Sequence, residues 1–300
     1  MPITTPQFRP PQDNLCPLLR LSFGCSHGKC RFCSIYDDES FSVVPMDTVI
    51  ADIEDIAKTA TALTRRIFLV GGNVFCLPTA HLIEVFEEVR KRIPTIKEFG
   101  GFCRIMDVAA KSDEELAQLA AYGVNNLSLG AESGWDPSLA FLQKGHTGAD
   151  IVEQVHRLKA AGIDSTLFYL AGSCGHGNGQ ENALASARVF SEANAKCILI
   201  VTLTPTKSWP LKEDIAAGRW TPPGEIETVE EIRTFIANLD PAICTSKINA
   251  SHDSDVVRFE GLMPPDHENM VALLDHMLPK ISEKAARDMR GFIHGANYYD

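Results

Sequence analysis

Three cysteines gather in one short segment of the chain, Cys25-Ser-His-Gly-Lys-Cys30-Arg-Phe-Cys33. Three thiolates in one loop can wrap around a single iron–sulfur cluster, and a C-x2-C pair lets two of them reach neighbouring iron atoms. Because only three cysteines are local, one iron would keep an open coordination position, which is typical of a metal centre that does chemistry. The segment therefore predicts a 4Fe-4S cluster with Cys25, Cys30 and Cys33 as its ligands.

Two other interpretations of this segment stay open on the residues alone. The same three thiolates, with His27 as a fourth ligand, would also suit a zinc ion. The cysteines could equally be a chance group of structural residues. Their place in the chain favours the cluster, because the segment directly follows an apolar run that predicts a strand over 16–23.

Composition narrows the class of protein. The 300 residues carry 28 Lys and Arg against 39 Asp and Glu, a net charge of −11, which argues against a nucleic-acid partner. No run of 18 apolar residues predicts a membrane span, and the Pro-rich start lacks the apolar stretch of a secretion signal. With nine cysteines, an odd number, we expect a cytoplasmic protein whose thiols serve metal or redox chemistry.

The elements that must position the cysteine loop alternate between strand and helix. Helical spacing of apolar residues begins near residue 47 and again near 82, and Ser112 with Glu115 forms a capping box. Apolar runs typical of buried strands lie at 16–23, 66–70, 96–105, 126–129, 166–170 and 197–203. Parallel strands need such crossover helices, so the pattern predicts an α/β fold, a partial (β/α)6 barrel whose chemistry lies where the strands end.

The predicted barrel has a segment on each side. Residues 1–14 form an N-terminal arm, 15–205 the barrel, and 206–300 a C-terminal helical extension packed on it. Within the extension, Thr228 and Glu231 predict the capped start of a helix that runs to Leu239. The remaining residues, 240–300, are expected to mix loop and helix.

With these motifs in place, the sequence resembles the radical S-adenosylmethionine (radical SAM) superfamily, and within it a group of iron–sulfur oxidoreductase-like proteins. The superfamily usually spaces its cysteines C-x3-C-x-aromatic-C, whereas this chain has C-x4-C-x2-C with Phe32 at the aromatic position. The resemblance runs from about Leu18 to Leu278. The segments that carry it are GCSHGKCRFC, RRIFLVGGNVFCLPT, LSLGAESG, LTPTKSWPL and SKINASH.

The resemblance implies cofactor contacts at the strand ends. Gly71-Gly72-Asn73 matches the Gly-Gly-Glu segment whose backbone meets the methionine amino group of S-adenosylmethionine (SAM), with Asn73 in place of Glu. Glu132 and Ser133 are implied contacts to the ribose or methionine part. Phe32, Gly172 and Thr204 complete the implied cofactor-binding set, the last two where the adenosine is usually held.

The resemblance also implies the chemistry. A reduced 4Fe-4S cluster would cleave SAM to a 5′-deoxyadenosyl radical, which abstracts hydrogen from a substrate, expected to be a small molecule. Its partners would be that substrate and an external electron donor of flavodoxin or ferredoxin type. Two alternatives are an iron–sulfur electron-transfer or metal-binding protein without catalysis, with a fourth protein ligand, and SAM-dependent aminocarboxypropyl transfer.

Three further cysteines lie near the ends of predicted strands. Cys76, Cys103 and Cys174 are therefore candidate catalytic residues, as hydrogen-atom donors or as ligands of a soft metal. The bland alternative is that each is a small core residue, the usual role of a buried cysteine.

Overall fold

The computed structural model describes residues 9–10, 13–36, 39–204 and 210–294, and the side chains as far as residue 289. The chain forms two compact units. The first takes its described residues from Met1–Gly28, Tyr36–Gly130 and His156–Ser165, and the second from Lys29–Ile35, Ala131–Val155 and Thr166–Asp300.

The first unit is built on parallel strands in the order β1-β4-β5-β6. In register, Leu19 lies opposite Leu69, and Leu69 lies opposite Gly101. A short antiparallel pair, β2 and β3, sits beside the cysteine loop. The bounds are β1 Leu18–Arg20, β2 Ser22–Phe23, β3 Ser42–Val43, β4 Arg66–Val70, β5 Glu98–Cys103 and β6 Leu127–Glu132.

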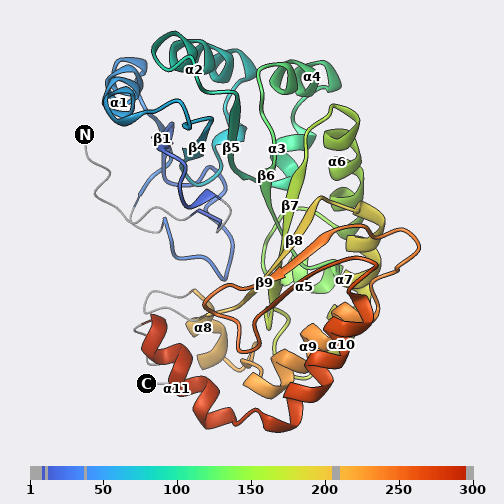
Figure 1. The fold of residues 1–300 in the computed structure, drawn as a ribbon. Coiled ribbons are helices and arrows are strands. Elements are labelled where there is room, and N and C mark those ends of the chain that lie inside the picture. Colours follow the sequence, from blue (N-terminus) through green and yellow to red (C-terminus); the bar gives the residue numbers. More distant parts are fainter. Residues whose placement is uncertain (1–8, 11–12, 37–38, 205–209, 295–300) are drawn as a thin grey trace. The chain divides into compact units, whose positions relative to one another are not determined.

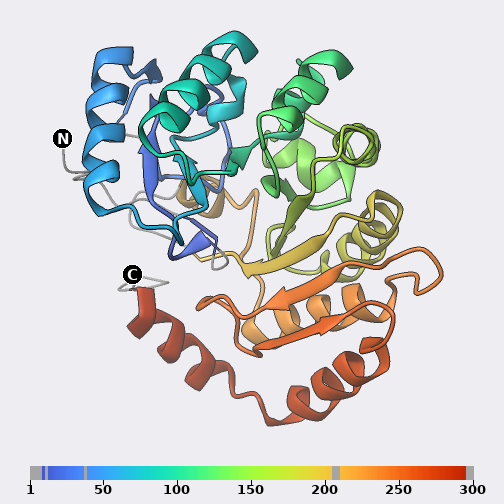
Figure 2. The same cartoon turned by 45° about the horizontal axis from the view of Figure 1, so that its top comes forward.

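Helices cover this sheet because apolar side chains repeat along one face of each. Helices α1 and α2 lie side by side (Figures 1 and 2), and Phe86 of α2 stacks on Phe99 of β5 with ring centroids 4.1 Å apart. The bounds are α1 Met46–Thr59, η2 Val74–Cys76, α2 Thr79–Arg92, α3 Ile105–Ala109, α4 Asp113–Ala121 and α6 Gly148–Ala160, of which α6 belongs partly to each unit.

The second unit contains the strand order β7-β8-β9-β10, parallel except for the antiparallel pair β9 and β10. Helix α9 lies between α7 and α10. The Tyr169 ring stacks on Phe235 at 4.1 Å, and Phe190 meets both rings edge-on, so β7, α7 and α9 share one aromatic core. The bounds are α5 Asp136–Phe141, β7 Ser165–Ala171, α7 Gly179–Ala193, β8 Cys197–Thr202, α8 Leu211–Ala216, α9 Glu225–Ala237, β9 Lys247–Ala250, β10 Phe259–Leu262, α10 His267–Met277, η3 Leu278–Lys280 and α11 Glu283–His294.

The predicted fold class is confirmed: the protein is α/β with a mostly parallel sheet and flanking helices. The capping box of Ser112 and Glu115 is present in both directions. Among the described residues, no helix has both the length and the apolar character needed to cross a bilayer.

Two expectations for the C-terminal segment are wrong. Residues 240–300 hold strands β9 and β10 besides loop and helix, so the sheet continues past the sixth predicted strand. Thr228 and Glu231 do not cap a helix, because α9 already begins at Glu225. The Thr228 hydroxyl donates to the Gly224 carbonyl one turn back, and the Glu231 side chain points into the core.

Candidate functional site

The first part of the site, in the first unit, is a close approach between Cys25 and the turn after β4. The Gly72 N–H donates to the Gly24 carbonyl at 2.9 Å. A Cβ atom added to Gly72 would lie 2.5 Å from the Cys25 Cβ, well inside van der Waals contact. Glycine is therefore required here because the two backbones touch. Gly71 is held in the same turn at φ 145°, facing the Ser22 side chain.

The Asn73 side chain fixes the start of the cysteine loop through hydrogen bonds. Its side-chain carbonyl accepts the backbone N–H of Ser26 at 3.0 Å and the thiol hydrogen of Cys25 at 3.4 Å. Its amide nitrogen donates to the Ser26 hydroxyl at 2.8 Å and to both carboxylate oxygens of Asp107. Asn73 is fully buried, and burial raises the pKa of Asp107. This network orients Cys25 before any cofactor is bound.

Cys76 and Cys103 lie around the same buried carboxylate. The Cys76 side chain hydrogen-bonds with that of Ser26, and the Cys103 thiol donates to the Arg104 carbonyl at 3.3 Å. Burial, followed by the charge of Asp107, raises the pKa of Cys103. Burial raises the pKa of Cys76 as well. Both cysteines are therefore protonated thiols at neutral pH, and the structure brings them to the Cys25 side of the first unit.

Cys30 and Cys33 belong to the second unit, where they form one turn. The Cys33 N–H donates to the Cys30 carbonyl at 3.1 Å, and the Arg31 N–H between them donates to the Leu142 carbonyl at 3.1 Å. The Arg31 guanidinium pairs with Asp214, whose side chain is 2% exposed. The turn is thereby tied both to the end of α5 and to α8.

Phe32, Lys144 and Glu132 form a second layer around that turn. The Lys144 ammonium lies 5.4 Å from the centroid of the Phe32 ring and 2.9 Å from a carboxylate oxygen of Glu132. Both charged side chains are nearly buried, at 4% and 10% exposure, so each needs the other. Glu132 also has φ 67°, a conformation that costs energy for any residue but glycine and that concentrates at binding sites.

Ser133, Gly172 and Cys174 are joined through one buried network centred on Glu231. The Ser133 hydroxyl donates to Asn182, whose amide donates to Glu231 at 2.8 Å. Glu231 also accepts from the Gly172 N–H at 3.1 Å and from the Cys174 thiol at 3.7 Å. The Tyr169 hydroxyl also donates a hydrogen bond to Glu231, at 2.7 Å.

Burial raises the pKa values of three titrating groups of this network: Glu231, Cys174 and Tyr169. Burial raises the pKa of Glu231 to about 7, against the lowering effect of its four hydrogen-bond donors. Burial, followed by the Glu231 charge, raises the pKa of Cys174, which therefore stays a thiol.

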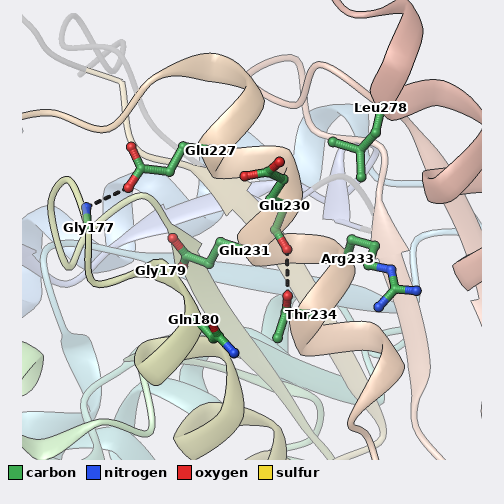
Figure 3. A pocket seen from close by; sticks show the side chains of 9 residues that line it. All are labelled: Gly177, Gly179, Gln180, Glu227, Glu230, Glu231, Arg233, Thr234 and Leu278. Carbon is green, nitrogen blue, oxygen red and sulfur yellow. Dashed lines mark hydrogen bonds between the residues drawn. The ribbon is translucent and has the colours of Figure 1, made fainter.

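Glu231 also lines a hollow of about 430 Å³ between the start of α7 and helix α9 (Figure 3). There Glu227 accepts the Gly177 N–H.

Thr204 follows β8, and its hydroxyl donates to the Thr202 carbonyl at 3.1 Å. The neighbouring Leu203 N–H donates to the Ala171 carbonyl, which fixes the end of β8 beside the end of β7. Pro205, the next residue of that sequence motif, lies outside the described residues.

The donor set of the cysteine segment suits an iron–sulfur cluster. All nine cysteines lie among the described residues and none forms a disulfide, and Cys25, Cys30 and Cys33 are each partly exposed. Within the described part of the chain, no three His, Cys, Asp or Glu side chains surround a position for one metal ion. A 4Fe-4S cluster instead takes one thiolate per iron.

Sequence reasoning missed Asp107, Lys144 and the Arg31–Asp214 pair, and it gave Glu231 a capping role. Only Glu231 had a readable signal. It lies three residues after Thr228 and four before Phe235, so it shares one face of α9 with these two buried residues. A carboxylate on an apolar helix face predicts a buried role rather than a cap.

The fold and site together define an α/β protein whose cysteine loop follows the first strands of a mostly parallel sheet. The sequence model of the Radical SAM superfamily matches residues 19–173, just over half of the 300 residues. The chain belongs to this superfamily. Its cofactors are accordingly a 4Fe-4S cluster and SAM. A comparison with proteins of curated function finds no significant match.

Solved structures share the fold at low sequence identity. The radical SAM methyltransferase TsrM from Kitasatospora setae, with cobalamin and a [4Fe-4S] cluster bound, is 18% identical, with a TM-score of 0.55 over 68% of this chain and 39% of that one. Elp3 from Methanocaldococcus infernus is 17% identical, with a TM-score of 0.54 over 88% and 63%. Methylornithine synthase (PylB) is 16% identical, with a TM-score of 0.50 over 87% and 81%. The chain thus spans about two fifths of the methyltransferase's length.

Proposed function

We propose that this protein is a radical SAM enzyme that acts on a small-molecule substrate. When bound at Cys25, Cys30 and Cys33, a reduced 4Fe-4S cluster would supply the electron for cleavage of SAM to methionine and a 5′-deoxyadenosyl radical, which would remove a hydrogen atom from the substrate. The observation that carries the proposal is the family match over residues 19–173, because it includes the cysteine loop and every strand end from β1 to β7.

The residues of the chain have binding and orienting roles in this proposal. Cys25, Cys30 and Cys33 hold the cluster, which uses the ligand chemistry of their thiolates. The Gly71-Gly72 backbone and Asn73 bind the methionine part of SAM, since the turn is rigidly seated against Cys25. Glu132 and Ser133 bind its polar groups from the end of β6, with Lys144 balancing the Glu132 charge.

Other residues shape the adenosine side and the substrate side. Phe32, Gly172 and Thr204 bind the adenosine, and the protonated thiols of Cys76, Cys103 and Cys174 are the candidate hydrogen donors. The electron comes from an external donor of flavodoxin or ferredoxin type. The net charge of −11 disfavours nucleic acid as the substrate and supports a small molecule. We place the enzyme in the cytoplasm, where nine cysteines without a disulfide stay reduced.

The experiment is an anaerobic turnover assay on the full chain. The purified protein is reconstituted with iron and sulfide, mixed with SAM and dithionite, and analysed for nucleoside products by mass spectrometry. Cys30→Ala is the test variant, and Cys16→Ala, a partly exposed cysteine outside the loop, is its matched control. We expect 5′-deoxyadenosine from the wild type and from Cys16→Ala, and a loss of at least a hundredfold in Cys30→Ala.

Each other outcome points away from the proposal. A loaded cluster that yields no nucleoside from SAM would favour a protein of electron transfer. 5′-Methylthioadenosine in place of 5′-deoxyadenosine would instead indicate aminocarboxypropyl transfer. Equal product from Cys30→Ala and Cys16→Ala would remove the cysteine loop from the reaction.

A further inference from the structure

A second hollow of the second unit, of about 340 Å³, lies where the loop after β6 meets the loop after β7. Its volume falls in the range of small-molecule sites. The Cys174 thiol forms part of its wall, so the hollow adjoins the Glu231 network. The aromatic, polar and charged residues that line it include Trp135, Ser138, Phe141, Cys174, Arg219 and Trp220.

The walls of this hollow are fixed. A Cβ atom on Gly175 would lie 2.8 Å from the Trp220 indole nitrogen, so the loop after β7 packs directly on the Trp220 ring. The His176 N–H donates to the Thr221 carbonyl at 2.8 Å and ties the same two loops together. Trp220 is only 6% exposed. A hollow with such a wall keeps its shape without a ligand, which lowers the entropic cost of binding.

Three aromatic rings line this hollow. Trp220 packs with the core residues Leu170, Leu203 and Leu211, and the Phe141 ring lies against the same cluster. Trp135 and Phe141 are half-buried, so each keeps part of its surface open to the hollow. Offset and edge-on contacts between aromatic rings add to the energy of burial, and such walls favour a flat aromatic ligand.

One buried polar atom of the hollow has no partner among the described residues. The Ser138 hydroxyl, on α5, is buried at 3% exposure and makes no hydrogen bond there. A buried hydroxyl left unpaired costs about 1–3 kcal/mol. Because Ser138 lines the hollow, a ligand with a hydrogen-bonding substituent would satisfy it.

Positive charge is in excess on one side of the hollow. Arg31 lies over the Phe141 ring at 5.3 Å, and both Arg31 and Arg219 pair with the single carboxylate of Asp214. Two guanidinium groups around one carboxylate leave one positive charge. On the other side Glu227 accepts the Gly177 N–H and contacts His176 at 2.7 Å, and it lines the neighbouring 430 Å³ hollow, not this one. An anionic substituent is therefore favoured near Arg219.

We propose that this hollow is the substrate site and that it takes a small aromatic carboxylate. The ring lies between Trp135, Phe141 and Trp220, and the carboxylate reaches the Ser138 hydroxyl and the Arg219 side. That the ligand is a substrate rests on the proposed function. Binding of the aromatic carboxylate itself needs neither the cluster nor SAM.

The test is calorimetric titration of the full chain with three probes of one shape: naphthalene-2-carboxylate, naphthalene-2-carboxamide and naphthalene-2-methylammonium. We expect saturable binding of the carboxylate, at least tenfold tighter than of the ammonium. The Phe141→Leu substitution should lower the affinity for each probe that the wild type binds by at least fivefold. Phe41→Leu, an exposed phenylalanine of the first unit, is its matched control and should change nothing.

Two smaller substitutions separate the polar contacts from folding. Arg219→Gln should weaken the carboxylate at least threefold while leaving the carboxamide unchanged, and Ser138→Ala should weaken both. The proposal is overturned if no probe binds, if the charge of the probe makes no difference, or if Phe141→Leu binds as the wild type does. It is also overturned if S-adenosylhomocysteine competes with the carboxylate, because the hollow then belongs to the cofactor. Binding of the probe in a protein that never cleaves SAM would sink the proposed reaction and leave this site standing.

Discussion

The side-chain amide of Asn73 donates to both carboxylate oxygens of Asp107, at 3.2 and 3.0 Å, in the interior of the first unit. This contact gives a physical reason for the residue at position 73. The related segments of the superfamily carry Glu there, and a carboxylate at this position would face the buried carboxylate of Asp107. An amide instead supplies the donor that Asp107 needs.

Asn73→Asp should therefore destabilise the protein in a way that its own partner can rescue. Two buried carboxylates about 3 Å apart cannot both ionise, so the substitution costs about 2–3 kcal/mol at pH 8. The free energy of unfolding from urea titration measures the loss. The loss should shrink at pH 5, because one of the two carboxyl groups is then protonated.

The rescue is the exchange Asn73→Asp with Asp107→Asn. Carboxylate at 73 still accepts from the Ser26 N–H and the Cys25 thiol, while the amide at 107 donates back to it. We expect the double variant to recover at least half of the lost stability. If the two single losses simply add, the contact between these residues does not control position 73.

Gly72→Ala should prevent loading of the cluster. The new Cβ would come 2.5 Å from the Cys25 Cβ and 2.7 Å from the Gly24 carbonyl oxygen, so the cysteine loop has to move. Such overpacking costs about 3 kcal/mol. Iron bound per chain after reconstitution should fall at least fivefold.

Gly162→Ala is the matched control for this substitution. Its φ is 81°, and a Cβ there meets no atom within 4 Å, so only backbone strain of about 1 kcal/mol is expected. Iron content should stay at the wild-type level. Full iron in Gly72→Ala would show that the close approach to Cys25 is dispensable.

Lys144→Met should destabilise the second unit more than most surface changes do. It leaves the Glu132 carboxylate buried without a cation, and breaking such a pair costs about 3–5 kcal/mol. Thermal and urea unfolding measure the loss. Lys58→Met, which breaks the exposed pair with Asp55, should leave unfolding unchanged. A Lys144→Met protein as stable as the wild type would mean that the ion pair with Glu132 contributes nothing to stability.

Local sequence patterns predicted some elements around the cysteine loop and not others. The single strand expected over 16–23 is two short strands, β1 and β2, which belong to different sheets. The run Arg66–Val70 coincides with β4, because five apolar or stem-burying side chains in a row suit a strand covered on both faces. Strands β9 and β10 were missed because each has only four residues, KINA and FEGL, which is too short for an alternating pattern to stand out from the surrounding loop. Their strand state comes from pairing with β8 and with each other, which no local pattern records.

The sequence predicts those site residues whose role follows from their residue type. It does not predict those whose role depends on a contact with a distant residue. Three cysteines at fixed spacing indicate a cluster from the chain alone. The roles of Lys144 and Glu231 depend on residues 12 and 59 positions away, Glu132 and Gly172 respectively. Such contacts follow from the fold and leave no trace in spacing.

Glu231 should make the stability of the protein depend on pH. Burial raises its pKa in the folded state to about 7, while an unfolded glutamate keeps a pKa near 4.5. The folded protein therefore holds a proton that the unfolded chain releases between these values. The contribution of Glu231 to stability is complete below about pH 4.5 and is lost as the pH rises through 7. The loss amounts to about 3 kcal/mol at pH 8.

Urea unfolding of the wild type and of Glu231→Gln at pH 5, 6, 7 and 8 measures this loss. The wild type should lose stability across this pH range relative to the variant, because the glutamine amide does not titrate. The groups around Glu231 do not confuse the reading, because Tyr169 and Cys174 both have raised pKa values and stay protonated there. Parallel pH profiles for the two proteins would show that Glu231 is ionised throughout, stabilised by the donors of Tyr169, Gly172 and Asn182.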